Sequence, residues 1–460
     1  MTDATVATLA ALVLGWAAVS GALAHRNITG PLVFVAAGYL LANAEWGLLT
    51  VDVETATIHG VAEITLALVL FSDATRVDLH ELRHDLWLPA RLLGIGLPLS
   101  VVLGAALATG TLDGIPWGLA AFVGAALAPT DAALSVQVIE DDRIPVRLRR
   151  ALNVESGLND GIATPIVTVT LAVAASQLGV VGGSTSFEAA DALRELGAGV
   201  AVGLVAGTAG AALLSLAARR DWTAPGARRL GTLAVAISAF TATLAIEGNG
   251  FIAAFVAGMA FGATLDKDVI DAERASELPE LGGEILALVV WFLFGASLLP
   301  EALEHAEART VAYALLSLTV VRMVPVVLSL VRSGLDHPSV LFVAWFGPRG
   351  LASVVFALLA VETLGDTSPA ADAAVAAVTL TVLLSVVLHG VTAGPGGRRY
   401  VQRERDTTQP GPRARPSRFS AGRDHPDARP RRSALRDVDA APHVPDNRHQ
   451  PPAGETETMP

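Results

Sequence analysis

The nine residues NVESGLNDG, at positions 153–161, place five polar side chains inside a mostly apolar run from about residue 150 to residue 176. A helix needs about 20 apolar residues to cross the hydrocarbon core of a membrane, and this run is long enough. A charged group at that depth costs about 2.5–3.5 kcal/mol on insertion scales, so it persists where it pairs, binds a ligand or exchanges a proton. The segment therefore predicts a membrane helix that carries a functional site.

The composition of the whole chain also indicates a membrane protein. Of the 460 residues, 52% are hydrophobic and only 17% are charged, whereas an ordinary soluble domain has about 25% charged residues. This balance excludes a disordered chain, a nucleic-acid binder and most soluble enzymes. The chain contains no Cys, which excludes disulfides, Cys-ligated zinc and thiol catalysis.

Apolar runs of similar length recur along the chain and predict an all-α polytopic membrane protein with about 13 transmembrane helices. We expect these helices at residues 5–24, 31–50, 57–73, 88–109, 115–139, 150–176, 197–218, 229–247, 250–265, 281–300, 309–332, 338–361 and 370–394. The first run lacks the charged start and cleavage site of a signal peptide, so we interpret it as a helix.

The distribution of basic residues predicts the orientation in the membrane. With 13 helices and a cytoplasmic C-terminus, the inner segments hold 15 Arg and Lys residues, and the outer loops hold only Arg194 and Arg309. Cytoplasmic loops carry such an excess of positive charge. We therefore expect a multi-pass protein of the cell membrane with its N-terminus outside.

The last part of the chain has a different composition. From Arg398 onward, 13 Arg residues stand against 9 acidic residues, and Pro is interleaved among them. Such a segment buries too little apolar surface to fold. We expect residues 1–396 to form the transmembrane domain and residues 397–460 to form a disordered, Arg/Pro-rich cytoplasmic tail. The tail is either inert or in contact with anionic lipid.

Two of the expected spans contain helix-breaking motifs at their centres. These motifs are PTD at 129–131 and GPRG at 347–350. The two spans are seven apart in order, so they cross the membrane in opposite directions, as an inverted-topology repeat requires. We expect a crossing of two unwound helices there, with Asp131 near a cation and Arg349 near the half-helix carbonyls. The other interpretation is a pair of simple Pro kinks.

The segment 153–161 presents two polar faces, because residues four apart share one face of a helix. Ser156 and Asp160 share one face and offer oxygen ligands for a hard cation. Glu155 and Asn159 share the other, which suits a bracing role. Arg322 lies inside the span 309–332 and needs a buried partner, which we expect to be Glu155.

Together these motifs resemble the sodium/proton antiporters of the monovalent cation:proton antiporter superfamily. The NhaP-type branch is the closer match because it carries Asn-Asp, here Asn159 and Asp160, where the electrogenic branch has Asp-Asp. The resemblance covers about residues 5–394. It implies a dimerisation domain and a mobile six-helix core with two crossed, unwound helices. The chain departs from the family at Ala132, where Pro is common.

The resemblance also implies roles for individual residues. Asp160 resembles the carboxylate that binds either the cation or the proton. The side chains of Asp131 and Ser156 and the backbone of Thr130 resemble its co-ligands for Na⁺, and Asn159 resembles the residue that holds the unwound helix.

The remaining correspondences concern charges around the site. Glu155 and Arg322 resemble the buried ion pair of the family, and Arg349 resembles its charge at the second break. Asp73 loosely resembles an acid of the ion funnel.

These features predict an antiporter that exchanges Na⁺, Li⁺ or K⁺ for H⁺ and serves pH homeostasis. Burial favours the protonated form of a carboxyl group and a bound cation favours the ionised form, so the two ions compete for one site. We expect elevator-type alternating access and electroneutral 1:1 exchange, since Asn159 replaces a second acid. The expected protein is a homodimer in membrane lipid, not an enzyme, and needs no cofactor.

Other functions fit parts of this pattern. A K⁺/H⁺ antiporter is the nearest alternative, and a cation channel or uniporter would share the acidic site without alternating access. An intramembrane aspartyl protease using Asp131 and Asp160 is disfavoured, because the residues GLN at 157–159 do not provide the Gly-x-Gly context before Asp160.

Overall fold

A computed structural model describes residues 3–24, 26, 28–42, 47, 55–76, 87–131, 134, 136–139, 141–180, 189–365 and 368–408. Within these ranges the protein consists of helices and contains no strand. The prediction of an all-α protein is therefore confirmed.

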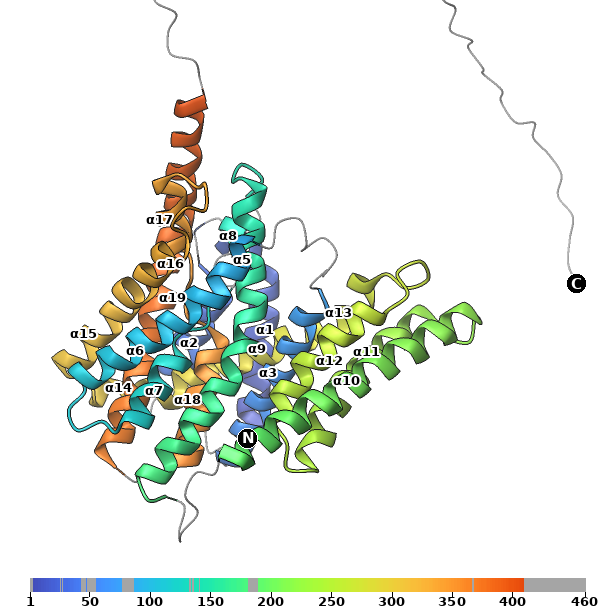
Figure 1. Ribbon diagram of the computed structural model, residues 1–460, viewed down its shortest axis with the longest axis horizontal. Helices are drawn as coiled ribbons and strands as arrows, with labels where there is room; N and C mark the ends of the chain where they lie inside the picture. The colour runs from blue at the N-terminus through green and yellow to red at the C-terminus, as the bar shows by residue number, and fades with distance from the viewer. Residues whose placement is uncertain are drawn as a thin grey trace, which may run out of the picture. The chain divides into compact units, whose positions relative to one another are not determined.

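The helices follow one another along the chain without any intervening domain (Figure 1). In the first half they are α1 (Asp3–Ala24), α2 (Gly30–Leu41), α3 (Thr55–Thr75), α5 (Trp87–Arg91), α6 (Leu97–Thr111), α7 (Trp117–Ala126), α8 (Val136–Ile139), α9 (Val146–Gln177) and α10 (Ala189–Arg219). In the second half they are α11 (Pro225–Leu244), α12 (Gly250–Thr264), α13 (Ala272–Leu293), α14 (Leu299–Glu304), α15 (Ala308–Leu316), α16 (Arg322–Ser329), α17 (His337–Trp345), α18 (Leu351–Leu364) and α19 (Pro369–Thr408).

Three pairs of these helices are each joined into one continuous helix by a π-helical turn. The turns are Leu92–Gly96 between α5 and α6, Phe294–Leu298 between α13 and α14, and Ser317–Val321 between α15 and α16. Every expected span overlaps a helix or a joined pair. In the described part of the chain, eight helices are long and apolar enough to cross a membrane by length and composition. The number 13 stays a prediction.

The helices that surround the centre of the protein come from distant parts of the chain. Figure 1 shows α9 running between the group α10, α11, α12 and α13 and the group α6, α7, α14 and α15. The helix α3 packs against both α12 and α13 and also contacts α9 and α18. The interrupted helix α18 therefore lies against α3 and α13, whereas α7 lies against α6 and α9.

Small residues allow close approach between helices, as expected from the Gly- and Ala-rich composition. A Cβ atom on Gly124 in α7 would lie 2.6 Å from the backbone nitrogen of Ala105 in α6. A Cβ on Gly203 in α10 would lie 2.6 Å from the carbonyl oxygen of Ala253 in α12. The close packing of both helix pairs therefore requires glycine at these positions, because any side chain would collide with the neighbouring backbone.

The expected start of the tail, at residue 397, lies inside α19, which continues to Thr408. Tyr400 and Val401 are buried there. The hydroxyl of Tyr400 lies 2.7 Å from the Ser339 hydroxyl of α17, and its ring lies 4.5 Å from that of Phe342. These contacts explain why the helix extends past the predicted boundary. Residues 409–460 of the expected tail lie outside the described residues.

Candidate functional site

The two interrupted helices lie against each other at the centre of the protein. The helix α7 ends at Ala126, three residues before Pro129, and the chain between α17 and α18 is not helical. The backbone N–H of Asp131 donates to the carbonyl of Pro348 over 2.8 Å, and the Ser353 hydroxyl donates to the carbonyl of Ala126 over 2.6 Å. The predicted crossing is therefore present. Ala132, where the chain departs from the family pattern, lies outside the described residues.

Arg349 is completely buried beside the end of α7. Its Nη1 donates to the carbonyl oxygens of Ala128 and Pro129, over 2.8 and 3.0 Å. These carbonyls follow the last turn of α7, where the helix dipole carries partial negative charge. Arg349 thus occupies the position expected from the sequence, with its positive charge against the broken end of α7.

Asp131 lies at the other end of the crossing, beside the first turn of α18. Its Oδ2 accepts a hydrogen bond from the backbone N–H of Leu351 over 3.1 Å. A carboxylate at a helix N-terminus satisfies a free N–H and interacts favourably with the dipole. Asp131 therefore caps α18 while it also faces the cavity described below.

The polar residues of α9 divide between two neighbours, but not into the two faces expected from their spacing, because Asn159 contacts the same neighbour as Ser156 and not the partner of Glu155. The amide of Asn159 donates to the Thr130 hydroxyl over 2.7 Å, and the Ser156 hydroxyl lies 3.2 Å from the same Thr130 oxygen. All three side chains are buried. The side chain of Thr130 is thus engaged by α9, which holds the unwound segment after α7 in place.

Glu155 points away from this group and pairs with Arg322 of α16. Two hydrogen bonds of 2.5 and 3.0 Å join the guanidinium to the two carboxylate oxygens. The exposed fractions are 3% for Glu155 and 4% for Arg322. The pair expected from the sequence is present, and neither residue lines the cavity.

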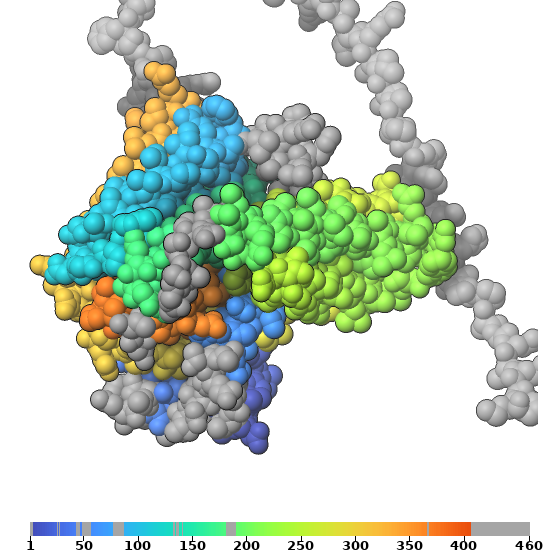
Figure 2. All heavy atoms as spheres, turned by 60° about the horizontal axis from the view of Figure 1, so that its bottom comes forward, coloured from blue at the N-terminus to red at the C-terminus, as the bar shows by residue number. Residues whose placement is uncertain are grey.

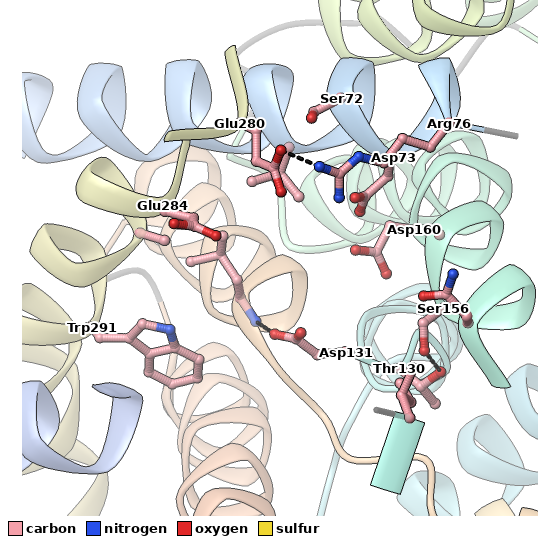
Figure 3. A pocket seen from close by; sticks show the side chains of 16 residues that line it. Ser72, Asp73, Arg76, Thr130, Asp131, Ser156, Asp160, Glu280, Glu284 and Trp291 are labelled. Carbon is pink, nitrogen blue, oxygen red and sulfur yellow. Dashed lines mark hydrogen bonds and ion pairs between the residues drawn. The ribbon is translucent and has the colours of Figure 1, made fainter. Parts of the chain in front are cut away.

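A cavity of about 380 Å³ separates α9 and the crossing from α3 and α13 (Figure 3). The carboxylates of Asp73, Asp131 and Asp160 reach it from three different segments. Among the described residues, Oδ1 of Asp160 is buried and has no hydrogen-bond partner. The polar and aromatic residues around the cavity include Ser72, Asp73, Arg76, Thr130, Asp131, Asn153, Ser156, Asp160, Glu280, Glu284 and Trp291.

The mouth of the cavity contains charged residues to which the sequence analysis gave no role. Arg76 of α3 forms an ion pair with Glu280 of α13, and Glu284 lies one turn further along α13 (Figure 3). The spacing of Glu280 and Glu284 predicts a shared helix face. It does not reveal that this face meets α3, because the contact joins residues about 200 positions apart.

The oxygen atoms around the cavity are of the kind that binds hard cations. Across the described ranges, no three His, Cys, Asp or Glu side chains are arranged to hold a metal ion together. A cation in this cavity would therefore also take ligands from hydroxyl groups, backbone carbonyls and water.

Gly350 provides a test of the Asp131 position. A Cβ on Gly350 would overlap the Asp131 carboxylate. Overpacking costs about 1–3 kcal/mol, so we expect Gly350→Ala to weaken apparent cation affinity about tenfold to a hundredfold. The measurement is the cation concentration that gives half-maximal proton movement in vesicles. Gly110→Ala is the matched control, because nothing lies within 4 Å of that Cβ. Equal affinities of the two variants would contradict the prediction.

The chain is similar in sequence and in fold to known proteins. The sequence model of the family described as "Sodium/hydrogen exchanger, transmembrane" matches residues 8–397. The chain is 27% identical over 330 residues to the K(+)/H(+) antiporter NhaP of Alkalimonas amylolytica, covering 71% of this chain and 55% of that protein. It is 24% identical over 371 residues to the K(+)/H(+) antiporter NhaP2 of Shewanella sp. (strain ANA-3), covering 80% and 62%.

The chain thus spans less than two thirds of the length of these curated relatives. Among solved structures, the fold is similar to that of the sodium proton antiporter MjNhaP1 from Methanocaldococcus jannaschii, with a TM-score of 0.71 and 20% sequence identity. That match covers 86% of this chain and 98% of the solved chain.

Proposed function

Because this chain belongs to the sodium/hydrogen exchanger transmembrane family, we propose that it is a secondary antiporter. It exchanges Na⁺, or Li⁺ or K⁺, for H⁺ across the cell membrane. The observation that carries this proposal is the position of Asp160, whose buried Oδ1 has no hydrogen-bond partner within the described residues. That carboxylate lies in a cavity lined by two further aspartates and by three residues with hydroxyl groups.

In this proposal Asp160 binds the cation and the proton alternately. Burial favours the neutral carboxyl group, and a bound cation favours the carboxylate, so each ion displaces the other. Asp131, Ser156 and Thr130 act as co-ligands of the cation. Their positions around the cavity support this role.

The surrounding residues maintain the site and guide the ion. Asn159 holds the unwound segment through Thr130, and Arg349 neutralises the carbonyls at the end of α7. The pair Glu155–Arg322 braces α9 against α16. Asp73, at the cavity, belongs to the path by which the ion enters.

Exchange further requires that the site open to the two sides of the membrane in turn. We propose an elevator-type movement of the core that carries the crossing, because one site that serves two ions then gives obligatory exchange. The reaction is ion transport rather than catalysis and needs no cofactor.

The cation is proposed to be Na⁺, with K⁺ as the second candidate. The solved structure of similar fold is that of a sodium proton antiporter, whereas the two curated relatives described above are named K(+)/H(+) antiporters. A pH-sensitive dye in everted vesicles distinguishes them when Na⁺, Li⁺ and K⁺ are added separately. A response to none of the three would overturn the proposed function, and a response to K⁺ alone would select the second candidate.

We expect exchange to be electroneutral, with one cation moved for one proton. The reason is Asn159, an amide that cannot titrate where a second acid would stand. Moving one net charge per cycle would couple the rate to voltage by about 2.3 kcal/mol per 100 mV. The measurement is proton flux in proteoliposomes clamped at different potentials with an ionophore. A flux that changes with voltage and carries net current would contradict the 1:1 stoichiometry.

The proposed environment is the cell membrane, with the N-terminus outside and the C-terminal tail in the cytoplasm. We also propose a homodimer embedded in lipid. Figure 2 shows α10 and α11 forming a ridge on one side of the described structure. Exposed apolar side chains along it include Val205, Leu213 and Leu230. Such side chains suit contact with acyl chains or with a second subunit.

A further inference from the structure

The helix α19 carries three polar residues on one face at the level of the crossing. They are Ser385, His389 and Thr392, at the spacing i, i+4 and i+7 that aligns side chains along a helix. Ser385 is 0% exposed and His389 is 1% exposed. Buried polar groups in a membrane protein need partners. The sequence analysis gave these three residues no role.

All three residues contact the interruption between α17 and α18. The Ser385 hydroxyl accepts a hydrogen bond from the backbone N–H of Arg349 over 2.6 Å. Nε2 of His389 lies 3.0 Å from the carbonyl oxygen of Trp345, the last residue of α17. The indole N–H of Trp345 donates to the Thr392 hydroxyl over 3.0 Å. The helix α19 therefore holds both ends of the interruption.

Both ring nitrogens of His389 lie beside hydrogen-bond partners. Nε2 lies 3.0 Å from the carbonyl oxygen of Trp345, and Nδ1 lies 3.0 Å from the carbonyl oxygen of Ser385 and 3.3 Å from its hydroxyl. A carbonyl oxygen only accepts, so in either neutral tautomer the ring N–H donates to one of these carbonyls. The contacts therefore run without a gap from Arg349 through Ser385 and His389 to Trp345.

The same ring also stacks on the Trp345 side chain. The two ring centroids are 5.1 Å apart and the planes are inclined by 28°. Stacking and hydrogen bonding together fix the end of α17 in distance and in rotation. An apolar side chain at position 389 would keep part of the packing against Trp345. The Trp345 carbonyl and the Ser385 hydroxyl would each lose one hydrogen-bond partner.

This chain of contacts reaches the cation site through the backbone. Arg349, fixed at its N–H by Ser385, binds the carbonyls of Ala128 and Pro129. Its neighbour Pro348 accepts the N–H of Asp131. The register of α19 against the interruption therefore sets where the segment 128–131 lies relative to Asp160.

We propose that His389, acting with Ser385, is a positioning residue of the transport site, and that it sets cation affinity by fixing the crossing. The inference rests on the proposed cation/proton exchange. His389 touches neither the cavity nor the transported ion, and it acts through Arg349 and Pro348.

The test compares His389→Leu with His389→Gln in everted vesicles. Leucine removes the donor and the acceptor, and glutamine retains both. A lost buried hydrogen bond leaves unpaired groups, so we expect His389→Leu to raise the apparent KM for the cation about tenfold or more. We expect His389→Gln to restore the KM to within about threefold of the wild-type value.

The KM for the cation distinguishes a positioning role of His389 from an effect of the substitution on folding. A purely structural defect lowers the amount of folded protein and the maximal rate, and leaves the KM of the folded fraction unchanged. Thr379→Val is the matched control on the same helix, because Thr379 is buried and its hydroxyl has no hydrogen-bond partner among the described residues. We expect this variant to keep the wild-type KM.

Each outcome is decisive. A wild-type KM in His389→Leu, or an equal rise in His389→Leu and His389→Gln, would overturn the positioning role. So would a rise of the same size in Thr379→Val. Absence of any cation response in the wild-type protein would instead refute the proposed exchange.

Discussion

Replacing Asp160 by Asn is expected to reduce cation-dependent proton movement to the background of vesicles that lack the protein. An amide neither binds a proton at physiological pH nor offers a negative charge to a cation. Asp160 is the buried carboxylate whose Oδ1 has no hydrogen-bond partner within the described ranges. Asn has nearly the same shape as Asp, so the fold is retained. The measurement is dye dequenching in everted vesicles with Na⁺, Li⁺ and K⁺.

Three further variants complete this experiment. Asp268→Asn neutralises an exposed aspartate that does not line the cavity and should leave the response unchanged. Asp160→Glu retains a carboxylate and should retain part of the response. Asp73→Asn alters the cavity wall and should weaken the response without abolishing it. A full response in Asp160→Asn, at equal amounts of protein in the membrane, would refute the central role of Asp160.

Replacing Arg322 by Met is expected to have the second largest effect, and this effect is on stability. The guanidinium makes two hydrogen bonds with Glu155, and both residues are almost completely buried. Removal of one partner from a buried pair costs about 3–5 kcal/mol, because an uncompensated charge remains. We expect a lower melting temperature in detergent and a smaller amount of folded protein. Glu155→Gln should have a similar effect through the orphaned Arg322.

The double variant Glu155→Gln with Arg322→Met shows whether the ion pair only stabilises the fold or also takes part in transport. Without either charge, no ion is left unpaired, so the double variant should be more stable than each single variant. Recovery is expected to be partial, because the Arg322 guanidinium fills the space beside Gly347. Neither residue lines the cavity, so the folded double variant should still exchange cations and protons. Stable protein without exchange would show that the pair takes part in transport.

The interruptions in the two helices were predicted from the motifs PTD and GPRG, in which Pro lacks a backbone N–H and obstructs the preceding turn. Proline alone does not decide an interruption, since Pro165, Pro279, Pro325 and Pro395 lie inside helices. The structure has α7 ending before Pro129 and α17 ending before Pro348. The Glu155–Arg322 contact was also predictable, since a permanent charge inside an apolar span requires a partner.

The partners at the crossing were not predictable in the same way. Asp131 gives one oxygen to the N–H of Leu351, 220 residues later. The Arg76–Glu280 pair spans 204 residues. Such contacts depend on which helix faces lie together, and the apolar pattern of a helix buried on several sides does not identify those faces. The contact between His389 and Trp345 was missed for the same reason.

By itself, the sequence determined the helical membrane class, the location of both helix breaks and the residues able to bind or neutralise charge. These properties follow from the length of apolar runs, from Pro geometry and from the cost of isolated charge in lipid. The tertiary structure alone decided which polar atoms meet across the crossing. It gave Asp131 a capping role and left Oδ1 of Asp160 without a partner in the part of the chain that it describes. The physical reason is that hydrogen bonds extend about 3 Å, so only the packing of distant helices can select them.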